Sequence, residues 1–205
     1  YFKHGNWIHS GNPIRKDVIQ KSDKSSAAAF FNLDPQKPIL FITGGSLGAR
    51  VLNECISKNL PLLTEKGIQL IWQTGNYFKI PENVTTGVWA KPFLREMNMA
   101  YSCADLVISR SGALSCSEIS AAGVPAILVP SKNVTDDHQT KNAQHVTRSG
   151  GAILVTDNNA PTELINKAIE IIQQPDILKK MSASLLQSAK PEATETIVNL
   201  IEESL

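Results

Sequence analysis

The stretch VISRSGALSCSEISAAGVPAILVP, residues 107–130, holds two apolar runs separated by a short glycine-broken segment that is rich in hydroxyl groups. The outer runs have the continuous Val, Ile and Leu of strands that are buried on both faces. Between them, ALSCSEISAA (113–122) fits a helix that Gly123 and Pro125 end. The stretch therefore predicts a strand, a helix and a second strand, which is the repeating unit of a parallel α/β sheet.

The same alternation continues on both sides of this unit, so the expected fold class is α/β with a doubly wound parallel sheet. Residues 21–29, KSDKSSAAA, are expected at the surface, and the first 15 residues are expected to form a connector. We expect strands at 38–43, 68–74, 105–110, 126–130 and 152–156 and a shorter one within 85–93, helices at 49–60, 95–104, 113–122 and 136–150, and then two or three helices that start near Pro161, Pro175 and Pro191.

Composition narrows the class of protein. The 205 residues are 42% hydrophobic and 19% charged, as in soluble globular proteins, and the net charge of +1 gives no bulk attraction to nucleic acid. The three cysteines and four histidines form no recognisable metal set, so we expect no metal and a reduced, cytosolic chain. The chain begins YFKHGNW without Met, and we therefore expect a trimmed chain that carries only part of an active site.

The glycine-rich segment TGGSLGAR (43–50) directly follows an expected strand. Glycines let backbone N–H groups approach an anion at the start of the next helix. The segment is not a P-loop, and Thr43 stands where a dinucleotide fingerprint needs its first glycine. WQTGN (72–76) also lacks the acidic residue that holds a dinucleotide ribose, which argues against NAD or FAD. A phosphate site and a ligand-free tight turn both remain open here.

SRSGALSCSE (109–118) is the second candidate loop. With Ser111 as N-cap, Ser111, Ser115 and Glu118 share one helix face. Hydroxyls and free N–H groups there suit phosphate, and Glu118 suits a pair of sugar hydroxyls. Spacing alone slightly favours the alternative of a capped helix with a solvated glutamate, because helical glutamates are mostly surface residues.

The third candidate loop is PSKNVTDDHQTKNA (130–143), with Thr135 as the expected N-cap of the following helix. Gln139 and Asn142 project from one face near that end, where two amides suit sugar hydroxyls; a polar exposed face is the alternative. For His138, a partly exposed helix histidine without a catalytic role is favoured over a general base. The sequence has no G-x-S-x-G elbow and no basic stripe with interleaved aromatics, so nothing in it supports a serine hydrolase of that type or a nucleic-acid binder.

Together these motifs resemble the C-terminal half of the MurG family, the bacterial UDP-N-acetylglucosamine transferases that form lipid II. The resemblance implies a Rossmann-like donor domain of a GT-B glycosyltransferase, in which two doubly wound domains face each other across a cleft. It divides the chain into a connector (1–15), a donor-binding domain (16–190) and a C-terminal helix (191–205) that packs back toward an N-terminal domain. The motifs that carry the resemblance are collinear: GNPIR (11–15), GGSLGAR (44–50), PFLREMNMAYSCADLVISRSGALSCSEISAAGVPAILVP (92–130), HQTKNA (138–143) and PEAT (191–194).

The resemblance also implies roles for single residues. Arg15 and Ser46 contact the diphosphate, Leu94 lies against the uracil through its backbone, and Glu118 holds the ribose hydroxyls. Gln139 and Asn142 read the sugar. Leu47 and His138 depart from the pattern, because relatives often carry glutamine at these positions. The full donor-binding set implied is Arg15, Gly45, Ser46, Leu94, Ser111, Gly112, Ala113, Leu114, Ser115, Glu118, Gln139 and Asn142.

The implied reaction is an inverting transfer of N-acetylglucosamine to the C4 hydroxyl of the N-acetylmuramoyl sugar of lipid I, with UDP leaving and no cofactor. The catalytic base would come from the N-terminal domain, which would also bind lipid I and touch the inner face of the cell membrane, so we expect no activity from this chain alone. Two alternatives stay open. One is the donor domain of another GT-B enzyme, a glycolipid glycosyltransferase or a UDP-GlcNAc 2-epimerase-like protein; the other is a split, non-catalytic donor-binding subunit. The KHGNWIHSGNP lead-in (3–13) resembles an inter-domain connector and favours an upstream domain.

Overall fold

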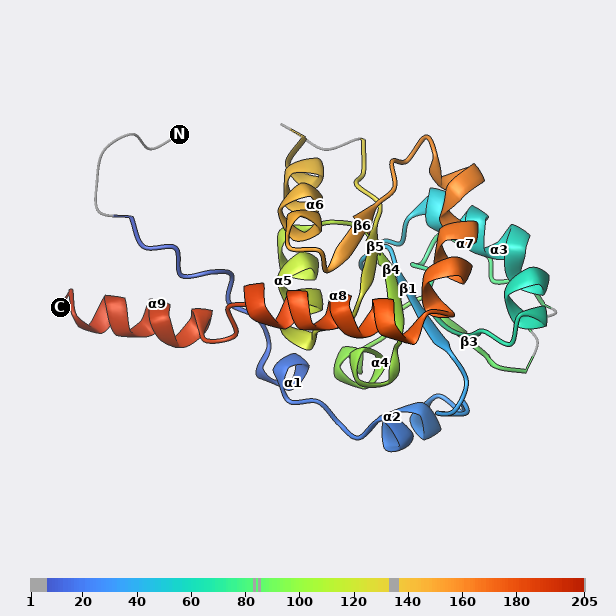
Figure 1. Ribbon diagram of the computed structural model, residues 1–205, viewed down its shortest axis with the longest axis horizontal. Coiled ribbons are helices and arrows are strands. Elements are labelled where there is room, and N and C mark those ends of the chain that lie inside the picture. The colour runs from blue at the N-terminus through green and yellow to red at the C-terminus, as the bar shows by residue number, and fades with distance from the viewer. Residues whose placement is uncertain (1–6, 83, 85, 133–136, 205) are drawn as a thin grey trace.

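The computed structural model describes residues 7–82, 84, 86–132 and 137–204. Within these ranges, six parallel strands form one sheet in the order β3-β2-β1-β4-β5-β6 (Figure 1). The doubly wound α/β class expected from the sequence is therefore confirmed. The strands are β1 (Ile39–Thr43), β2 (Gln69–Gln73), β3 (Val88–Lys91), β4 (Leu106–Ser109), β5 (Ala126–Leu128) and β6 (Ala152–Leu154).

The strand order reverses between β1 and β4, and the loops that leave this point form the candidate site. Thr43, the last residue of β1, is paired with Gln73 of β2 on one side and with Ser109 of β4 on the other. The three strands therefore end level with one another. Ligands of doubly wound sheets bind outside the carboxyl ends of strands at such a reversal.

Helices cover both faces of this sheet (Figure 1). One buried cluster joins β-strand side chains such as Phe41 and Val107 to helices α2, α4, α5 and α6, and a second joins Ile42 and Ile108 to α3 and α7. The helices are α1 (Lys16–Ile19), α2 (Lys24–Phe30), α3 (Arg50–Glu65), α4 (Met97–Cys103), α5 (Ala113–Ala122), α6 (His138–Arg148), α7 (Ala160–Ile172), α8 (Pro175–Ser188) and α9 (Ala193–Glu202).

Helix α3 runs past the point at which the sequence predicted its end. The expected helix stops at residue 60, before Pro61, whereas α3 continues through Pro61 to Glu65. Proline removes one backbone donor and crowds the preceding turn. Leu60 and Leu63 are both buried on the core side of the helix. Their burial favours continuation of the helix, and this outweighs the effect of the proline.

The expectation that residues 21–29 lie at the surface is wrong in part. Helix α2 forms there, and Ala27 and Ala28 are completely buried in the core. Asp23 begins this helix, because its carboxylate accepts a hydrogen bond from the Ser26 N–H at 3.0 Å. The segment is polar on average, but its small alanine side chains form one apolar helix face that packs into the core.

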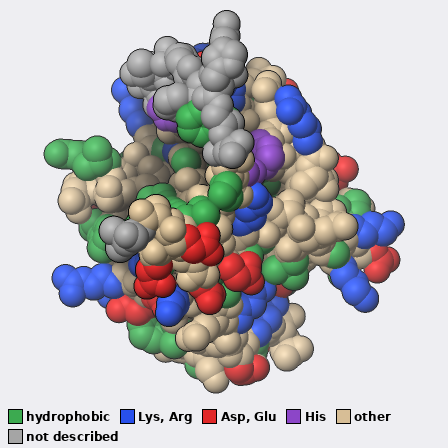
Figure 2. All heavy atoms as spheres, turned by 90° about the vertical axis from the view of Figure 1, so that its left-hand side faces the viewer, with side chains coloured by type: hydrophobic (Ala, Val, Ile, Leu, Met, Phe, Trp, Pro, Cys, Tyr) green, Lys and Arg blue, Asp and Glu red, His purple; other side chains and the backbone are tan. Residues whose placement is uncertain are grey.

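Helix α9 projects away from the body of the domain (Figure 1). Ala193 is the residue that it buries, while Val198 and Ile201 are exposed. Figure 2 shows the domain from the side on which α9 projects, and acidic side chains gather near the middle of this face. Among the described residues, no helix combines the length and the apolar character needed to cross a lipid bilayer.

Candidate functional site

A cleft of about 390 Å³ opens at the carboxyl ends of β1, β2 and β3, beside helices α4 and α5. Two arginines and one carboxylate stand in its wall among neutral polar and apolar groups, so the cleft suits a ligand that has both an anionic and an apolar part. The lining residues are Arg15, Thr43, Gly45, Ser46, Gln73, Phe93, Leu94, Arg95, Met97, Tyr101, Ser115 and Glu118.

The turn after β1 (residues 44–49) brings backbone to the cleft because its glycines allow a close approach. Gly48 has a φ of +77°, and a Cβ placed on it would lie 2.0 Å from the carbonyl oxygen of Thr74. Gly45 has a φ of +81° but nothing within 4 Å of its Cβ position, so it faces open space. Helix α3 then starts without a side-chain cap. Its first N–H groups are therefore available to an anion.

Gln73, at the end of β2, ties together the loops that follow β1 and β3, and sequence reasoning missed it. Its Nε2 donates to the Gly45 carbonyl at 2.8 Å and to the Thr43 hydroxyl at 3.4 Å. Its Oε1 accepts from the Leu94 N–H at 3.1 Å. The side chain is almost fully buried, at 3% exposure. The available signal was a glutamine that directly follows the apolar run LIW (70–72), at the end of the strand where ligands bind.

Glu118 lies on the α5 wall of the cleft with its carboxylate held from two sides. Arg15 Nη2 lies 3.3 Å from Oε1, and the Tyr101 hydroxyl donates to Oε2 at 3.4 Å. The Glu118 side chain is 15% exposed, whereas that of Arg15 is 49% exposed. Glu118 is thus oriented from the protein side and keeps one edge toward the cleft. The prediction of a solvated glutamate is not favoured by this geometry.

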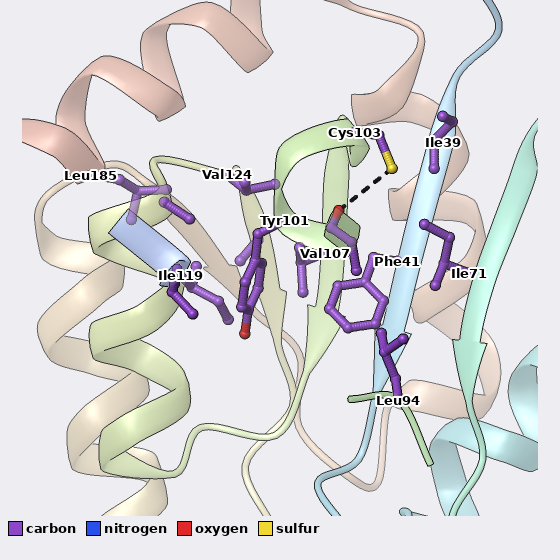
Figure 3. Close-up of a cluster of buried hydrophobic side chains, with 14 of the residues drawn as sticks. Ile39, Phe41, Ile71, Leu94, Tyr101, Cys103, Val107, Ile119, Val124 and Leu185 are labelled. Atoms are coloured by element: carbon purple, nitrogen blue, oxygen red, sulfur yellow. Dashed lines mark hydrogen bonds between the residues drawn. The ribbon is translucent and has the colours of Figure 1, made fainter. Parts of the chain in front are cut away.

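Tyr101 reaches Glu118 from inside the core. Its ring stacks edge-on against Phe41, with 5.5 Å between the ring centroids. In Figure 3 the ring lies among the labelled apolar side chains, and the hydroxyl oxygen points toward the lower part of the view, where Leu94 also lies. Burial, and secondarily the negative charge of Glu118, raise the pKa of Tyr101 well above its usual value. The phenol therefore stays protonated and acts as a hydrogen-bond donor to the carboxylate.

Ser111 does not cap helix α5, so that prediction is wrong. Gly112 is the N-cap, and it has no side chain to bond the first turn. The Ser111 hydroxyl is completely buried and instead donates to the Gln139 carbonyl of α6 at 2.8 Å. Ser115 and Glu118 line the cleft from the same helix. Gly112, Ala113 and Leu114 stand at the uncapped start of α5, outside the lining of the cleft.

Gln139 and Asn142 both hold backbone in this structure. Gln139 Oε1 accepts from the Ser131 N–H at 2.9 Å, and Asn142 Nδ2 donates to the Ser111 carbonyl at 3.0 Å. They fasten α6 to the loops after β4 and β5. The N-cap expected at Thr135 lies outside the described residues, and the structure gives Asp137 as the N-cap of α6.

The side chain of Arg110, which follows β4 directly, bonds to other protein groups and does not line the cleft. Its Nη1 lies 2.5 Å from an Asp157 carboxylate oxygen and donates to the Val129 carbonyl at 3.0 Å. Both side chains of this ion pair are largely buried. Arg15 and Arg95 are therefore the guanidinium groups in the lining of the cleft. Across the described ranges, no group of three or more His, Cys, Asp or Glu side chains is placed to hold a metal ion.

Level strand ends, an uncapped helix start, two guanidinium groups and an oriented carboxylate meet at one edge of a doubly wound sheet, which is where domains of this class bind their ligands. The model of the glycosyltransferase family 28 C-terminal domain matches residues 39–197. The chain belongs to this family.

Curated relatives agree with the family. A UDP-N-acetylglucosamine--N-acetylmuramyl-(pentapeptide) pyrophosphoryl-undecaprenol N-acetylglucosamine transferase of Cytophaga hutchinsonii is 45% identical over 199 residues, which cover 96% of this chain and 54% of the relative. The transferase of the same name from Parabacteroides distasonis is 38% identical over 201 residues, covering 95% of this chain and 55% of the relative. The chain thus spans about half the length of these proteins.

Solved structures show the same relationship. The crystal structure of Acinetobacter baumannii MurG matches with a TM-score of 0.71 and 31% identity, over 91% of this chain and 55% of that one. The resemblance to the C-terminal half of the MurG family is therefore confirmed. The calicheamicin glycosyltransferase CalG4, at 16% identity and a TM-score of 0.63 over 84% of this chain and 46% of that one, shares the fold.

Proposed function

We propose that this chain is the donor-binding half of an inverting glycosyltransferase that transfers N-acetylglucosamine from UDP-N-acetylglucosamine to lipid I and so forms lipid II. The observation that carries this proposal is the Glu118 carboxylate, held by Arg15 and Tyr101 at the wall of a cleft beside the strand-order reversal. The names of the curated relatives support the choice of donor and acceptor.

The proposed orientation of the nucleoside diphosphate places its uracil near the loop after β3 and its diphosphate near the turn after β1. Leu94, on the loop after β3, offers backbone to the uracil, and Glu118 accepts hydrogen bonds from the ribose hydroxyls. The diphosphate then lies near Ser46 and the uncapped start of α3, with Arg15 neutralising its charge. On donor binding, Arg15 exchanges its contact with Glu118 for the diphosphate, which frees the carboxylate for the ribose.

Gln139 and Asn142 are proposed to read the N-acetylglucosamine hydroxyls from the start of α6. Each amide uses one end on backbone, namely Gln139 Oε1 on Ser131 and Asn142 Nδ2 on Ser111. The opposite ends, Gln139 Nε2 and Asn142 Oδ1, are the ones that face the sugar in this proposal. Anchoring one end fixes the direction of the other, which favours selectivity among sugars.

The chemistry proposed for this half is orientation and charge stabilisation. The C4 hydroxyl of the acceptor muramoyl sugar attacks the anomeric carbon of the donor, and the bond to the UDP oxygen breaks. Negative charge grows on the departing diphosphate, where Arg15 and the N–H groups of α3 stabilise it without a protein-bound metal or other cofactor. The base that removes the acceptor proton belongs to the other half of the enzyme.

The acceptor lipid and the membrane are partners that we assign to the other half of the full-length protein. We propose that the N-terminal half binds lipid I and brings the enzyme to the inner face of the bacterial cell membrane from the cytoplasm, without a nucleic-acid partner. This chain alone should then bind the donor and transfer no sugar. A kinetic assay with the chain, UDP-N-acetylglucosamine and a lipid I analogue tests the division of labour, and robust turnover would refute it.

Titration calorimetry with UDP, UDP-N-acetylglucosamine and UDP-glucose tests the donor assignment. We expect UDP to bind to the folded chain, and Glu118→Ala to weaken binding at least about tenfold, the equivalent of about 1.4 kcal/mol. Absence of UDP binding to a well-folded chain contradicts the donor-domain proposal. Equal affinity for the two sugar nucleotides contradicts the sugar-reading roles of Gln139 and Asn142 while leaving the nucleotide site intact.

A further inference from the structure

Gln73 occupies an unusual position for a strand glutamine. Its side chain is 3% exposed, yet it lines the cleft, and both ends of its amide are bonded to backbone of other loops. One end receives the Leu94 N–H from the loop after β3, and the other donates to the Gly45 carbonyl in the turn after β1. A single planar group thus connects two loops that are far apart in sequence.

These two loops are the opposite ends of the proposed ligand site. Leu94 stands at the base end, and Gly45 precedes Ser46 at the diphosphate end. The Thr43 hydroxyl extends the connection, because it lies 3.4 Å from Gln73 Nε2 and accepts the Gly45 N–H at 3.3 Å. A rigid amide that is bonded at both ends fixes the separation between the loops, and a ligand that touches both loops gains from that fixed separation.

We infer that Gln73 is a positioning residue that sets the spacing between the base end and the diphosphate end of the cleft, and thereby couples the binding of the nucleoside to the binding of the diphosphate. The inference rests on the proposed function. It adds to the proposed site an uncharged residue, which acts by holding two loops in place and not by an ion pair with the nucleotide. Its consequence is selective: removing the amide harms a ligand that spans both loops more than one that contacts a single loop.

The same strand supplies a matched control. Gln69, at the opposite end of β2, is also buried and also uses both ends of its amide on backbone, since Nε2 donates to the Asp34 carbonyl at 2.7 Å and Oε1 accepts the Asp34 N–H at 2.8 Å. It lies outside the lining of the cleft. Gln69→Leu and Gln73→Leu should therefore cost comparable stability, while only Gln73→Leu should change nucleotide binding.

Calorimetry on the wild-type chain and both Leu variants, with UDP and with uridine, measures the selective effect. For Gln73→Leu we expect about a tenfold loss of UDP affinity and a smaller loss of about threefold for uridine, which lacks the diphosphate. For Gln69→Leu we expect both affinities to stay within about twofold of the wild-type values. Circular dichroism establishes that each variant is folded at the temperature of the titration.

Gln73→Glu supplies a readout that a merely structural role would not move. An ionised carboxylate accepts the Leu94 N–H but cannot donate to the Gly45 carbonyl, whereas a protonated carboxyl group can do both. Burial of this position beside the Gly45 carbonyl disfavours the charged form and raises the pKa of the new carboxyl group above its usual value. We therefore expect the UDP affinity of this variant, taken relative to wild type at each pH, to be reduced about tenfold near pH 8 and largely restored near pH 5. The ratio for Gln73→Leu should not change with pH.

The outcomes separate the two proposals. A wild-type chain that does not bind UDP contradicts the proposed function, and the inference with it. If the wild type binds UDP but the folded Gln73 variants match it at every pH, or if Gln69→Leu weakens UDP to the same extent, the positioning role alone is wrong. Should Gln73→Leu fail to fold, the pH dependence of Gln73→Glu decides the matter.

Discussion

Two short turns leave neighbouring strands at the same edge of the sheet, one after β1 (44–49) and one after β4 (110–112), and they are held in different ways. The turn after β1 requires a residue without a side chain, because Gly48 packs directly against the backbone carbonyl of Thr74. The turn after β4 depends on a buried hydroxyl, because Ser111 is bonded to helix α6. Steric fit therefore fixes one turn, and polar contacts fix the other.

The difference has a functional meaning. Close packing of backbone leaves Gly45 facing open space beside the uncapped start of α3, where the diphosphate is proposed to bind. Bonding to α6 connects the start of α5 with Gln139 and Asn142, the residues proposed to read the sugar. In the proposed function, the first turn thus serves the phosphates, and the second relates the nucleotide to the sugar.

Replacement of Gly48 by Ala should break the first turn and give the largest effect. The new Cβ would lie 2.0 Å from the Thr74 carbonyl oxygen, and the φ of +77° adds strain for any residue with a side chain. We expect the free energy of unfolding to fall by about 3 kcal/mol or more. The control is Gly45→Ala, whose similar φ meets open space, with an expected loss of about 1 kcal/mol. Urea denaturation of both variants measures the difference, and equal losses would show that packing is not what holds this turn.

Removal of the Ser111 hydroxyl should loosen the second turn by a smaller amount. Ser111→Ala leaves the Gln139 carbonyl without this partner, and Asn142→Ala removes the bond to the Ser111 carbonyl. We expect about 1–2 kcal/mol of destabilisation from each. Because both bonds fasten the same turn to α6, the double variant should lose less than the sum of the two. Strict additivity in chemical denaturation would contradict a shared connection.

Ionisation of Cys116, in the helix that follows the second turn, should have no effect near neutral pH and one that appears only at high pH. Burial raises the pKa of its thiol from 9.0 to about 12. The unfolded chain therefore loses this proton first, and the native chain is the more protonated state between pH 9 and pH 12. Stability present below pH 9 is lost across that window, by about 1 kcal/mol per pH unit for this group. Under reducing conditions Cys116→Ala should flatten the decline of the unfolding free energy. A decline identical to that of wild type would rule out this contribution.

Local pattern was enough to predict the sheet but not the polar connections of the site. Continuous Val, Ile and Leu placed each strand to within a few residues, and Gly123, with a φ of +58°, ends α5 as expected. Ser111 was misread as a cap because its true partner, Gln139, lies 28 residues away. Gln73 was missed for the same reason, since its partners Gly45 and Leu94 lie 28 and 21 residues away in the sequence. Contacts of this length follow from the packing of the fold and leave no periodic signal in the chain.

Glu118 is proposed to accept the ribose hydroxyls of a nucleoside diphosphate, and a thermodynamic cycle tests this role most directly. UDP and 2′,3′-dideoxy-UDP are titrated calorimetrically into the wild-type chain and into Glu118→Ala. We expect the wild type to bind UDP at least about tenfold more tightly than the dideoxy ligand, and this preference to disappear in Glu118→Ala. A preference for UDP that survives unchanged in the variant would contradict this role of Glu118.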